Sequence, residues 1–331
     1  MLPSITLSTG RCTTALGFGC SSLMRLPEVR DRQRLLDLVA DLGIRHFDVS
    51  RLYGLGQVEG EIGALLRRHS GHFTVATKCG LGEAHPPSAS VQRQGGLRRI
   101  LQLAPGIRPL VRRFYGRCIV RRDFTAGHCL LSLQTSLSQL GLESVDLLLL
   151  HEPTPFDAVD QTLEVFLQDS QRQGLIGGYG ISGLPGPSLA LWRQRPGLAP
   201  HLLQLEDNLL TPEPPAFSAT EEYPALRGRF GRIRLSLQPI QQAFAAVPQL
   251  QRFWSDRLNL FLGEPNSLVA ALLGAGLAGF PNDLLLFATT DPDRLRRILS
   301  LLHSPPWDAY EAIAFERFWR SHSDPSLSKC P

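Results

Sequence analysis

Short apolar runs alternate with amphipathic stretches along most of the chain. Such runs, bounded by turn residues, are typical of strands buried in a sheet. Eight segments have this character: 15–18, 46–49, 73–77, 145–150, 178–181, 202–205, 232–237 and 284–288. Between them, apolar residues recur at spacings of three and four, which predicts helices. The helical pattern is clear over 30–42, 58–68, 125–140, 156–171 and 292–302.

Regular alternation of strands and helices predicts a parallel sheet. The run VDLLLL at 145–150 is nearly all apolar, as in a strand covered on both faces. We therefore expect an α/β fold of the (β/α)8 TIM barrel class, forming one domain over residues 1–331, with an N-terminal β-hairpin over the first fifteen residues. The rival is a doubly wound sheet, but the segment GFGCSS at 17–22 lacks the third glycine of its GxGxxG turn.

Three segments interrupt the alternation. Residues 82–122 form a long connection after the third strand, and loops of that length are usually functional or disordered. Residues 210–231 are rich in proline and acidic residues and predict irregular structure, and 304–331 reads as a C-terminal tail.

Composition excludes several classes of protein. With 43% hydrophobic and 19% charged residues, the chain is a globular sequence rather than a disordered one. The apolar stretch at 268–277 is too short to cross a bilayer, and the first residues lack the pattern of a secretory signal. Six scattered cysteines without ligand-like spacing indicate a cytoplasmic protein with no disulfide and no structural metal. The net charge of +4 is too small and dispersed to indicate nucleic acid.

Lysine is nearly absent, and this draws attention to one position. Of the 34 basic residues, only Lys78 and Lys329 are lysines, so 34 − 2 = 32 are arginines. Lys78 directly follows an apolar strand, whereas Lys329 lies close to the C-terminus. Because a buried lysine makes a compact charge that an arginine does not reproduce, Lys78 is a candidate functional residue.

Polar side chains stand at three predicted strand ends. Asp48 ends the second strand and Tyr53 follows in its loop, Lys78 ends the third strand, and His151 ends the fourth. In a (β/α)8 barrel the carboxyl ends of the strands meet at one face, where catalytic residues gather. Singly, these residues have ordinary structural explanations as a cap, a core-edge aromatic or a satisfied histidine. Together they predict one site.

The chemistry of the four side chains suits carbonyl reduction. A phenol has a pKa of about 10 and a nearby ammonium lowers it, so we expect Lys78 to lower the pKa of Tyr53. Asp48 would hold Lys78 charged, and His151 would donate a second hydrogen bond to the oxygen that Tyr53 protonates. No side chain supplies hydride, so a nicotinamide cofactor is required.

One motif is specific enough to indicate a family. Residues 48–54 read DVSRLYG, and Glu59 and Gly63 follow. Together with 15–19, 73–78, 122–125, 145–151, 180–182 and 204–206, this motif resembles the aldo-keto reductase superfamily over nearly the whole chain. The resemblance implies a catalytic tetrad with Tyr53 as general acid during reduction. Its members are Asp48, Tyr53, Lys78 and His151.

The resemblance also implies NADPH, or less often NADH, bound across the mouth of the barrel. The positions that it assigns to the cofactor are Gly19, Ser182, Gln204, Gln238, Thr289 and Arg294. Arg294 stands where an arginine often meets the 2′-phosphate. Other positions depart from the family: Gly183 replaces an asparagine that binds the carboxamide, LQPI at 237–240 lacks the usual stacking aromatic, and Arg297-Ile298 replaces a pair that addresses adenine.

The insertion suggests an anionic substrate. It contains no acidic residue between Ala84 and Arg122 but nine arginines: Arg93, Arg98, Arg99, Arg108, Arg112, Arg113, Arg117, Arg121 and Arg122. Because it follows Lys78, it leaves the barrel at the catalytic face, where amphipathic pieces at 97–103 and 110–119 are expected to form a lid. A solvated, arginine-rich loop is the alternative.

The sequence leaves three classes of function to compare. We expect an NAD(P)H-dependent oxidoreductase that reduces a small aldehyde or ketone, or catalyses the reverse oxidation. A non-catalytic or cofactor-weakened binding protein on the same barrel is the alternative, favoured by the changes at Gly183, Leu237 and Ile298. A metal-dependent hydrolase is disfavoured, because the strand ends lack a second histidine or a carboxylate cluster.

Overall fold

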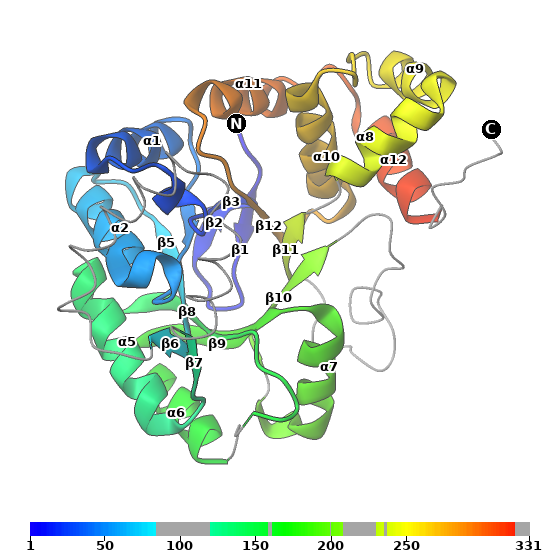
Figure 1. The fold of residues 1–331 in the computed structure, drawn as a ribbon. Coiled ribbons are helices and arrows are strands. Elements are labelled where there is room, and N and C mark those ends of the chain that lie inside the picture. The colour runs from blue at the N-terminus through cyan, green and yellow to red at the C-terminus, as the bar shows by residue number, and fades with distance from the viewer. Residues whose placement is uncertain (84–119, 158–160, 199, 208–229, 235–236, 322–331) are drawn as a thin grey trace, which may run out of the picture. The chain divides into compact units, whose positions relative to one another are not determined.

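The structure is a computed structural model of the chain, and it describes residues 1–83, 120–157, 161–198, 200–207, 230–234 and 237–321 (Figure 1). Internal contacts divide the chain into two compact units. The first comprises Met1–Phe18, Val39–Arg45 and Leu202–Pro331, and the second comprises Gly19–Leu38 and His46–His201. Helix α1 (Val29–Asp41) crosses the boundary between the two ranges.

The second unit is built on parallel strands. These are β4 (His46–Asp48), β5 (Thr74–Cys79), β8 (Val145–His151) and β9 (Ile176–Gly183), hydrogen-bonded in that order. The helices that follow them are α2 (Gln57–Arg68), α5 (Ala126–Leu140), α6 (Gln161–Arg172) and α7 (Pro185–Gln194). Every residue of β5 is buried, and so is every residue of β8 except Asp146. Both strands are therefore covered on both faces.

Helices α2 and α5 approach each other closely at Gly63. A Cβ on this residue would lie 2.6 Å from the carbonyl oxygen of Gln139 and 2.7 Å from that of Leu140. Only glycine allows this contact without a shift of the backbone. Gly63, which belongs to the motif that begins at Asp48, therefore acts in packing. It allows α2, the helix that follows the Tyr53 loop, to lie close to α5.

The first unit has a second set of parallel strands. In hydrogen-bonded order they are β10 (Leu202–Asp207), β11 (Phe230–Arg234), β12 (Leu284–Phe287) and β3 (Leu16–Gly19). An antiparallel hairpin of β1 (Ser4–Thr6) and β2 (Cys12–Thr14) precedes them, as predicted. The helices are α8 (Leu237–Ala246), α9 (Pro248–Arg257), α10 (Pro265–Gly279), α11 (Pro292–His303) and α12 (Ala309–Ser321).

Helix α10 explains the longest apolar stretch of the sequence. It packs against α11 and α12, and its residues from Ser267 to Gly276 are all buried. The stretch is thus the core of this unit, where close packing on several sides requires an apolar helix all round. Among the described residues, no helix is both long and apolar enough to cross a membrane.

The predicted fold class is confirmed. Within each unit the parallel strands follow the order expected of a (β/α)8 barrel, β10-β11-β12-β3 in the first unit and β4-β5-β8-β9 in the second, and each of the eight predicted strands is present with bounds that differ by a few residues. The predicted helices are present too, but residues 155–157, at the start of the helix predicted over 156–171, form a turn, 158–160 lie outside the described residues, and α6 is described from Gln161. The difference arises because Asp157 accepts hydrogen bonds from both the backbone and the hydroxyl of Thr154, which forms a turn instead.

The interrupting segments are described only in part. The ends of the insertion form an antiparallel ribbon of β6 (Leu81–Glu83) and β7 (Val120–Arg122), while its predicted lid helices lie outside the described residues. Most of the segment at 210–231 lies outside them as well. The segment at 304–331 contains α12, which was not predicted. Short 3-10 turns complete the description: η1 (Leu23–Arg25), η2 (Tyr53–Gly56) and η5 (Pro196–Leu198).

Candidate active site

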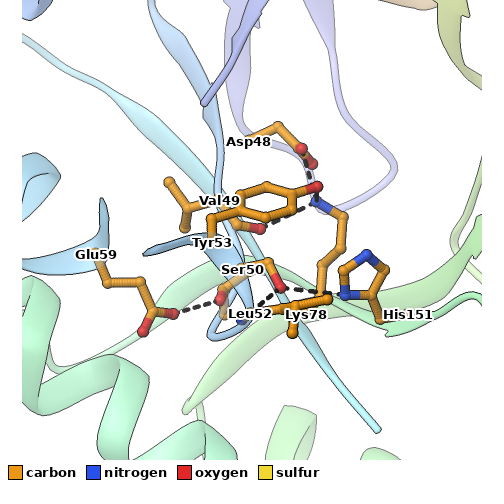
Figure 2. Close-up of polar contacts among 9 residues, drawn as sticks. Asp48, Val49, Ser50, Leu52, Tyr53, Glu59, Lys78 and His151 are labelled. Carbon is orange, nitrogen blue, oxygen red and sulfur yellow. Dashed lines mark hydrogen bonds and ion pairs between the residues drawn. The ribbon is translucent and has the colours of Figure 1, made fainter. Parts of the chain in front are cut away.

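Adjacent strands of the second unit bring the four predicted catalytic residues together. Asp48 is the last residue of β4, Lys78 lies near the end of β5, and His151 is the last residue of β8. Because β4 pairs with β5 and β5 pairs with β8, their carboxyl ends lie side by side. Tyr53 begins the turn η2 that follows β4, and Figure 2 shows its ring above the Lys78 side chain.

Lys78 is the centre of this group. Its Nζ donates to Asp48 Oδ1 at 2.6 Å, to the carbonyl oxygen of Val49 at 3.0 Å and to the Tyr53 hydroxyl at 3.2 Å. The side chain is almost wholly buried, with 1% of its surface exposed, and Asp48 is exposed to only 3%. Three acceptors therefore satisfy the three protons of a buried ammonium.

The charges of this group determine the protonation of Lys78 and Tyr53. Burial lowers the pKa of Lys78, but the adjacent Asp48 carboxylate and the Tyr53 oxygen outweigh burial and raise it above its usual value. Burial raises the pKa of Tyr53, and the Lys78 ammonium offsets this only in part. Lys78 therefore lowers the pKa of Tyr53 as expected, but the net shift is upward, because desolvation of the phenolate exceeds the attraction of the ammonium.

His151 is neutral and lies edge-on to Tyr53. The two ring centroids are 5.9 Å apart and the ring planes make an angle of 88°. Burial, with smaller contributions from the charges of Lys78 and Arg122, lowers the pKa of His151 to about 3. Its Nδ1 lies 3.1 Å from the hydroxyl oxygen of Ser50, and this leaves Nε2 for a ligand.

Ser50 is a site residue that sequence reasoning missed. It stands two positions after Asp48, where the alternation of an extended chain places its side chain on the same face. That spacing was the available signal. The serine also lies inside the DVSRLYG motif, so its place in the chain pointed to the site without indicating its role.

A buried ion pair supports the loop that carries Tyr53. The Glu59 carboxylate is wholly buried and accepts from Arg51 Nη1 at 2.9 Å and from Thr77 Oγ1 at 2.7 Å. The turn must leave room for Arg51, since a Cβ on Gly56 would lie 2.5 Å from its Nη1. Gly56 also has a φ of +82°, in the left-handed region that glycine tolerates best.

The chain after His151 is held by the end of the insertion. Arg122 donates from Nη2 to the carbonyl oxygen of Glu152 at 2.7 Å and binds both carboxylate oxygens of Asp157. Glu152 has a φ of +50°, which is strained for a residue with a side chain. The pairing with Asp157 thus holds the Arg122 side chain against the loop that follows His151.

The predicted cofactor residues of the second unit lie near the ends of strands. Gly19, the last residue of β3, is the first residue of the second unit, since the division between the units falls after Phe18. Ser182 is buried near the end of β9. The adjacent Gly183 faces the loop after His151, since a Cβ there would lie 3.2 Å from Glu152 Cα. A larger residue would thus have to displace that loop slightly, which is a physical reason for the departure from asparagine.

The other predicted cofactor residues belong to the first unit. Gln204 is buried in β10, Gln238 is exposed on α8, and Thr289 is buried after β12. Asp291 caps α11 by accepting from the backbone N–H groups of Asp293 and Arg294. The Nε of Arg294 is buried and has no hydrogen-bond partner among the described residues. Among all the residues that the structure describes, no cluster of His, Cys, Asp and Glu has the arrangement of a metal site.

Comparison with known proteins establishes the family. A sequence model described as the aldo/keto reductase family matches residues 15–219, and the chain belongs to this family. It is 28% identical over 194 residues to D-threo-aldose 1-dehydrogenase of Pseudomonas sp, covering 55% of this chain and 54% of that protein. It is 32% identical over 149 residues to pyridoxal 4-dehydrogenase of Microbacterium luteolum, covering 44% and 41%. The chain thus spans about half the length of these curated relatives or less.

A solved structure agrees on the fold. The aldo-keto reductase AKR2E5, determined in complex with NADPH, matches with a TM-score of 0.62 and 16% identity. The match covers 96% of this chain and 88% of that one. Similarity at this level of identity indicates a shared fold only.

Proposed function

We propose that the protein is a nicotinamide-dependent oxidoreductase that reduces an aldehyde or ketone to an alcohol, or catalyses the reverse oxidation. The observation that carries the proposal is the buried Lys78 ammonium, which contacts both the Asp48 carboxylate and the Tyr53 hydroxyl. Such a group places a proton donor beside a fixed positive charge. Family membership supports the same chemistry.

Tyr53 acts as the general acid in the proposed reaction. Its raised pKa keeps the hydroxyl protonated near neutral pH, so a proton is available for the carbonyl oxygen of the substrate. The phenolate that remains is stabilised by Lys78 Nζ, which lies 3.2 Å from the oxygen. Asp48 holds the lysine charged and in place, and His151 donates a second hydrogen bond to the same substrate oxygen. In the oxidation the proton moves in the opposite direction.

The residues of the chain fit a phosphate-bearing nicotinamide cofactor. When bound, the nicotinamide supplies or accepts the hydride, which no side chain can do. The buried, unpartnered Nε of Arg294 is a donor suited to an anionic oxygen, which favours NADPH over NADH. Gly19, Ser182, Gln204, Gln238 and Thr289 are the further residues proposed to hold the cofactor.

The names of the relatives support a small polar substrate. One curated relative is a dehydrogenase of an aldose and the other is a dehydrogenase of pyridoxal. We extend to this chain only the class that they share, a small carbonyl compound or the corresponding alcohol. The proposal includes a cytoplasmic location, since Cys12, Cys20, Cys79 and Cys129, the cysteines among the described residues, form no disulfide with one another.

An anionic substrate is part of the proposal and has its own test. Of the nine arginines of the insertion, seven lie outside the described residues, and the other two, Arg121 and Arg122, pair with Asp123 and Asp157. If the remaining arginines steer an anion, kcat/KM for an anionic carbonyl should fall with ionic strength relative to a matched neutral one. A preference that salt does not change, or no preference, would contradict this part.

A cofactor-weakened binding protein is the second candidate. It is favoured by Gly183 and by Ile298, whose side chain is wholly buried in α11 and so takes no part in binding adenine. Titration of protein fluorescence with NADPH and then with NADH distinguishes the candidates, followed by turnover on a panel of aldehydes, ketones and alcohols. We expect saturable binding of NADPH and turnover. Absence of saturable cofactor binding, or binding without turnover on any compound, would favour the second candidate.

A further inference from the structure

The hydroxyl of Ser50 connects the loop after β4 to the catalytic histidine. Its Oγ lies 3.1 Å from His151 Nδ1, and it accepts the backbone N–H of Leu52 at 3.1 Å (Figure 2). Ser50 has no exposed surface. The contact joins residues 101 positions apart in the sequence and is therefore a feature of the tertiary structure.

The direction of the hydrogen bond follows from the proton of the serine. A hydroxyl has one proton to donate and two lone pairs, and the N–H of Leu52 occupies one lone pair. Because Ser50 is buried, water is excluded as an acceptor. Among the described residues, no other acceptor lies in hydrogen-bond contact with this hydroxyl. An unpaired buried proton is costly, so the hydroxyl donates to His151 Nδ1.

We infer that Ser50 is a positioning residue that holds His151 in the tautomer with its proton on Nε2. Since Nδ1 accepts from Ser50, the single proton of the neutral ring must be on Nε2. That nitrogen is the one on the far side of the ring from Ser50, and Figure 2 shows it facing the group formed by Lys78 and Tyr53. The inference rests on the proposed function for its catalytic meaning.

The tautomer determines whether His151 helps or opposes the proposed reaction. With its proton on Nε2, the ring donates to the substrate oxygen as negative charge develops there. With the proton on Nδ1, Nε2 would present a lone pair to the same oxygen and repel it. Only one ring nitrogen can donate, because the neutral ring carries a single proton. Burial and the charges of Lys78 and Arg122 keep the ring neutral by lowering its pKa to about 3.

The tautomer can be measured without turnover. In full-length protein labelled with ¹⁵N-histidine, the shifts and couplings of the ring nitrogens distinguish the two neutral tautomers, and loss of one signal set in His151→Gln assigns the residue. We expect the Nε2–H form in the parent protein and a mixture or the Nδ1–H form in Ser50→Ala. Ser50→Thr, which keeps the hydroxyl, should restore the Nε2–H form.

A matched control separates positioning from packing. Ser136 is also a wholly buried serine, in α5, and its hydroxyl lies 3.5 Å from that of Thr77. Ser136→Ala should leave the His151 signals unchanged. In turnover, Ser50→Ala should lower kcat about tenfold, the order expected for one hydrogen bond. The KM for the cofactor should stay as in the parent, and Ser50→Thr should recover kcat.

Two results would overturn the inference. One is an Nδ1–H tautomer in the parent protein, which decides the matter even if Ser50→Ala fails to fold. The other is a folded Ser50→Ala variant that keeps both the Nε2–H tautomer and the parent kcat. Because the spectrum is independent of substrate, failure of the parent protein to reduce any carbonyl compound would count against the proposed function alone.

Discussion

Lys78 Nζ donates to Asp48 Oδ1 at 2.6 Å, and both side chains are almost wholly buried. Each group alone would be costly to bury, and together they form a neutral pair with a net raised pKa at Lys78. The pair links the ends of the adjacent strands β4 and β5. It is therefore a structural element of the second unit as well as the support for Tyr53.

Removing the charge of Asp48 should destabilise the protein and impair turnover. Asp48→Asn leaves the Lys78 ammonium buried without its counter-charge, which typically costs about 3–5 kcal/mol. Urea unfolding at neutral pH measures the change in free energy of unfolding. In the control Asp31→Asn, the exposed pair with Arg34 is lost, and the change should stay within about 1 kcal/mol. Equal effects of the two substitutions would contradict the role given to the buried pair.

Replacing Lys78 with arginine should abolish most of the activity although the charge is kept. The guanidinium is larger and planar, and no space remains around a side chain exposed to only 1%. We expect turnover to fall by about 100-fold or more, as for loss of a group that positions the general acid. Steady-state kinetics and circular dichroism on Lys78→Arg test this. Folded protein with turnover within a few fold of the parent would show that only the charge matters.

Removing the Tyr53 hydroxyl should stop proton transfer and leave cofactor binding intact. Tyr53→Phe loses the group that donates the proton, so turnover should fall by about 10²–10⁴-fold. The dissociation constant of NADPH, followed by fluorescence, should change little. The control is Tyr179→Phe, a buried tyrosine in β9 that packs edge-on against His201. Comparable losses in the two variants, or none in Tyr53→Phe, would end the proposed mechanism.

His46 should make the protein sensitive to acid. Burial, with a contribution from Lys78, lowers its pKa in the folded protein from 6.5 to about 3. Between these two pH values the unfolded chain binds a proton that the folded one does not. The contribution of His46 to the free energy of unfolding is therefore fully present above pH 6.5 and is lost progressively as the pH falls toward 3. In this pH range, one such histidine makes the free energy of unfolding fall by at most about 1.4 kcal/mol for each pH unit.

His46→Gln is expected to make that slope shallower. The free energy of urea unfolding, measured between pH 7 and pH 4, provides the comparison. Some acid sensitivity should remain, because the pKa of His151 is lowered to about 3 as well. His72→Gln, on the surface, serves as the control and should keep the slope of the parent. An unchanged slope in His46→Gln would show that His46 is not buried in its neutral form.

Arg294 should distinguish the two nicotinamide cofactors. Its buried, unpartnered Nε can meet a 2′-phosphate, and a charge-assisted hydrogen bond contributes about 1.5–3 kcal/mol. Arg294→Ala should therefore weaken NADPH binding by at least about tenfold and leave NADH binding nearly unchanged. Arg296→Ala, whose side chain pairs with Asp293 on the exposed face of α11, is the matched control. An equal loss for both cofactors would show that Arg294 does not contact the phosphate.

Local pattern by itself determined the order of strands and helices and the positions of three tetrad residues at strand ends. Alternation and helical spacing depend on neighbouring residues, so they can be read directly, and a break such as the Thr154–Asp157 turn before α6 shifts only a boundary. The motif at 48–54 indicated that Tyr53 belongs to the same predicted site as Asp48, Lys78 and His151. Helix α10 shows the limit of local pattern. Its apolar stretch was too short for a membrane span, but the pattern did not identify that stretch as a helix of the core.

Tertiary structure alone decided the electrostatics of the site. The net direction of the Tyr53 pKa depends on how completely β4, β5 and β8 exclude water, and no local pattern reports that exclusion. The contact of Ser50 with His151 requires two strands, 101 residues apart in sequence, to end at the same place. Burial and long-range hydrogen bonds are properties of the assembled strands, whereas residue type and spacing are properties of the chain.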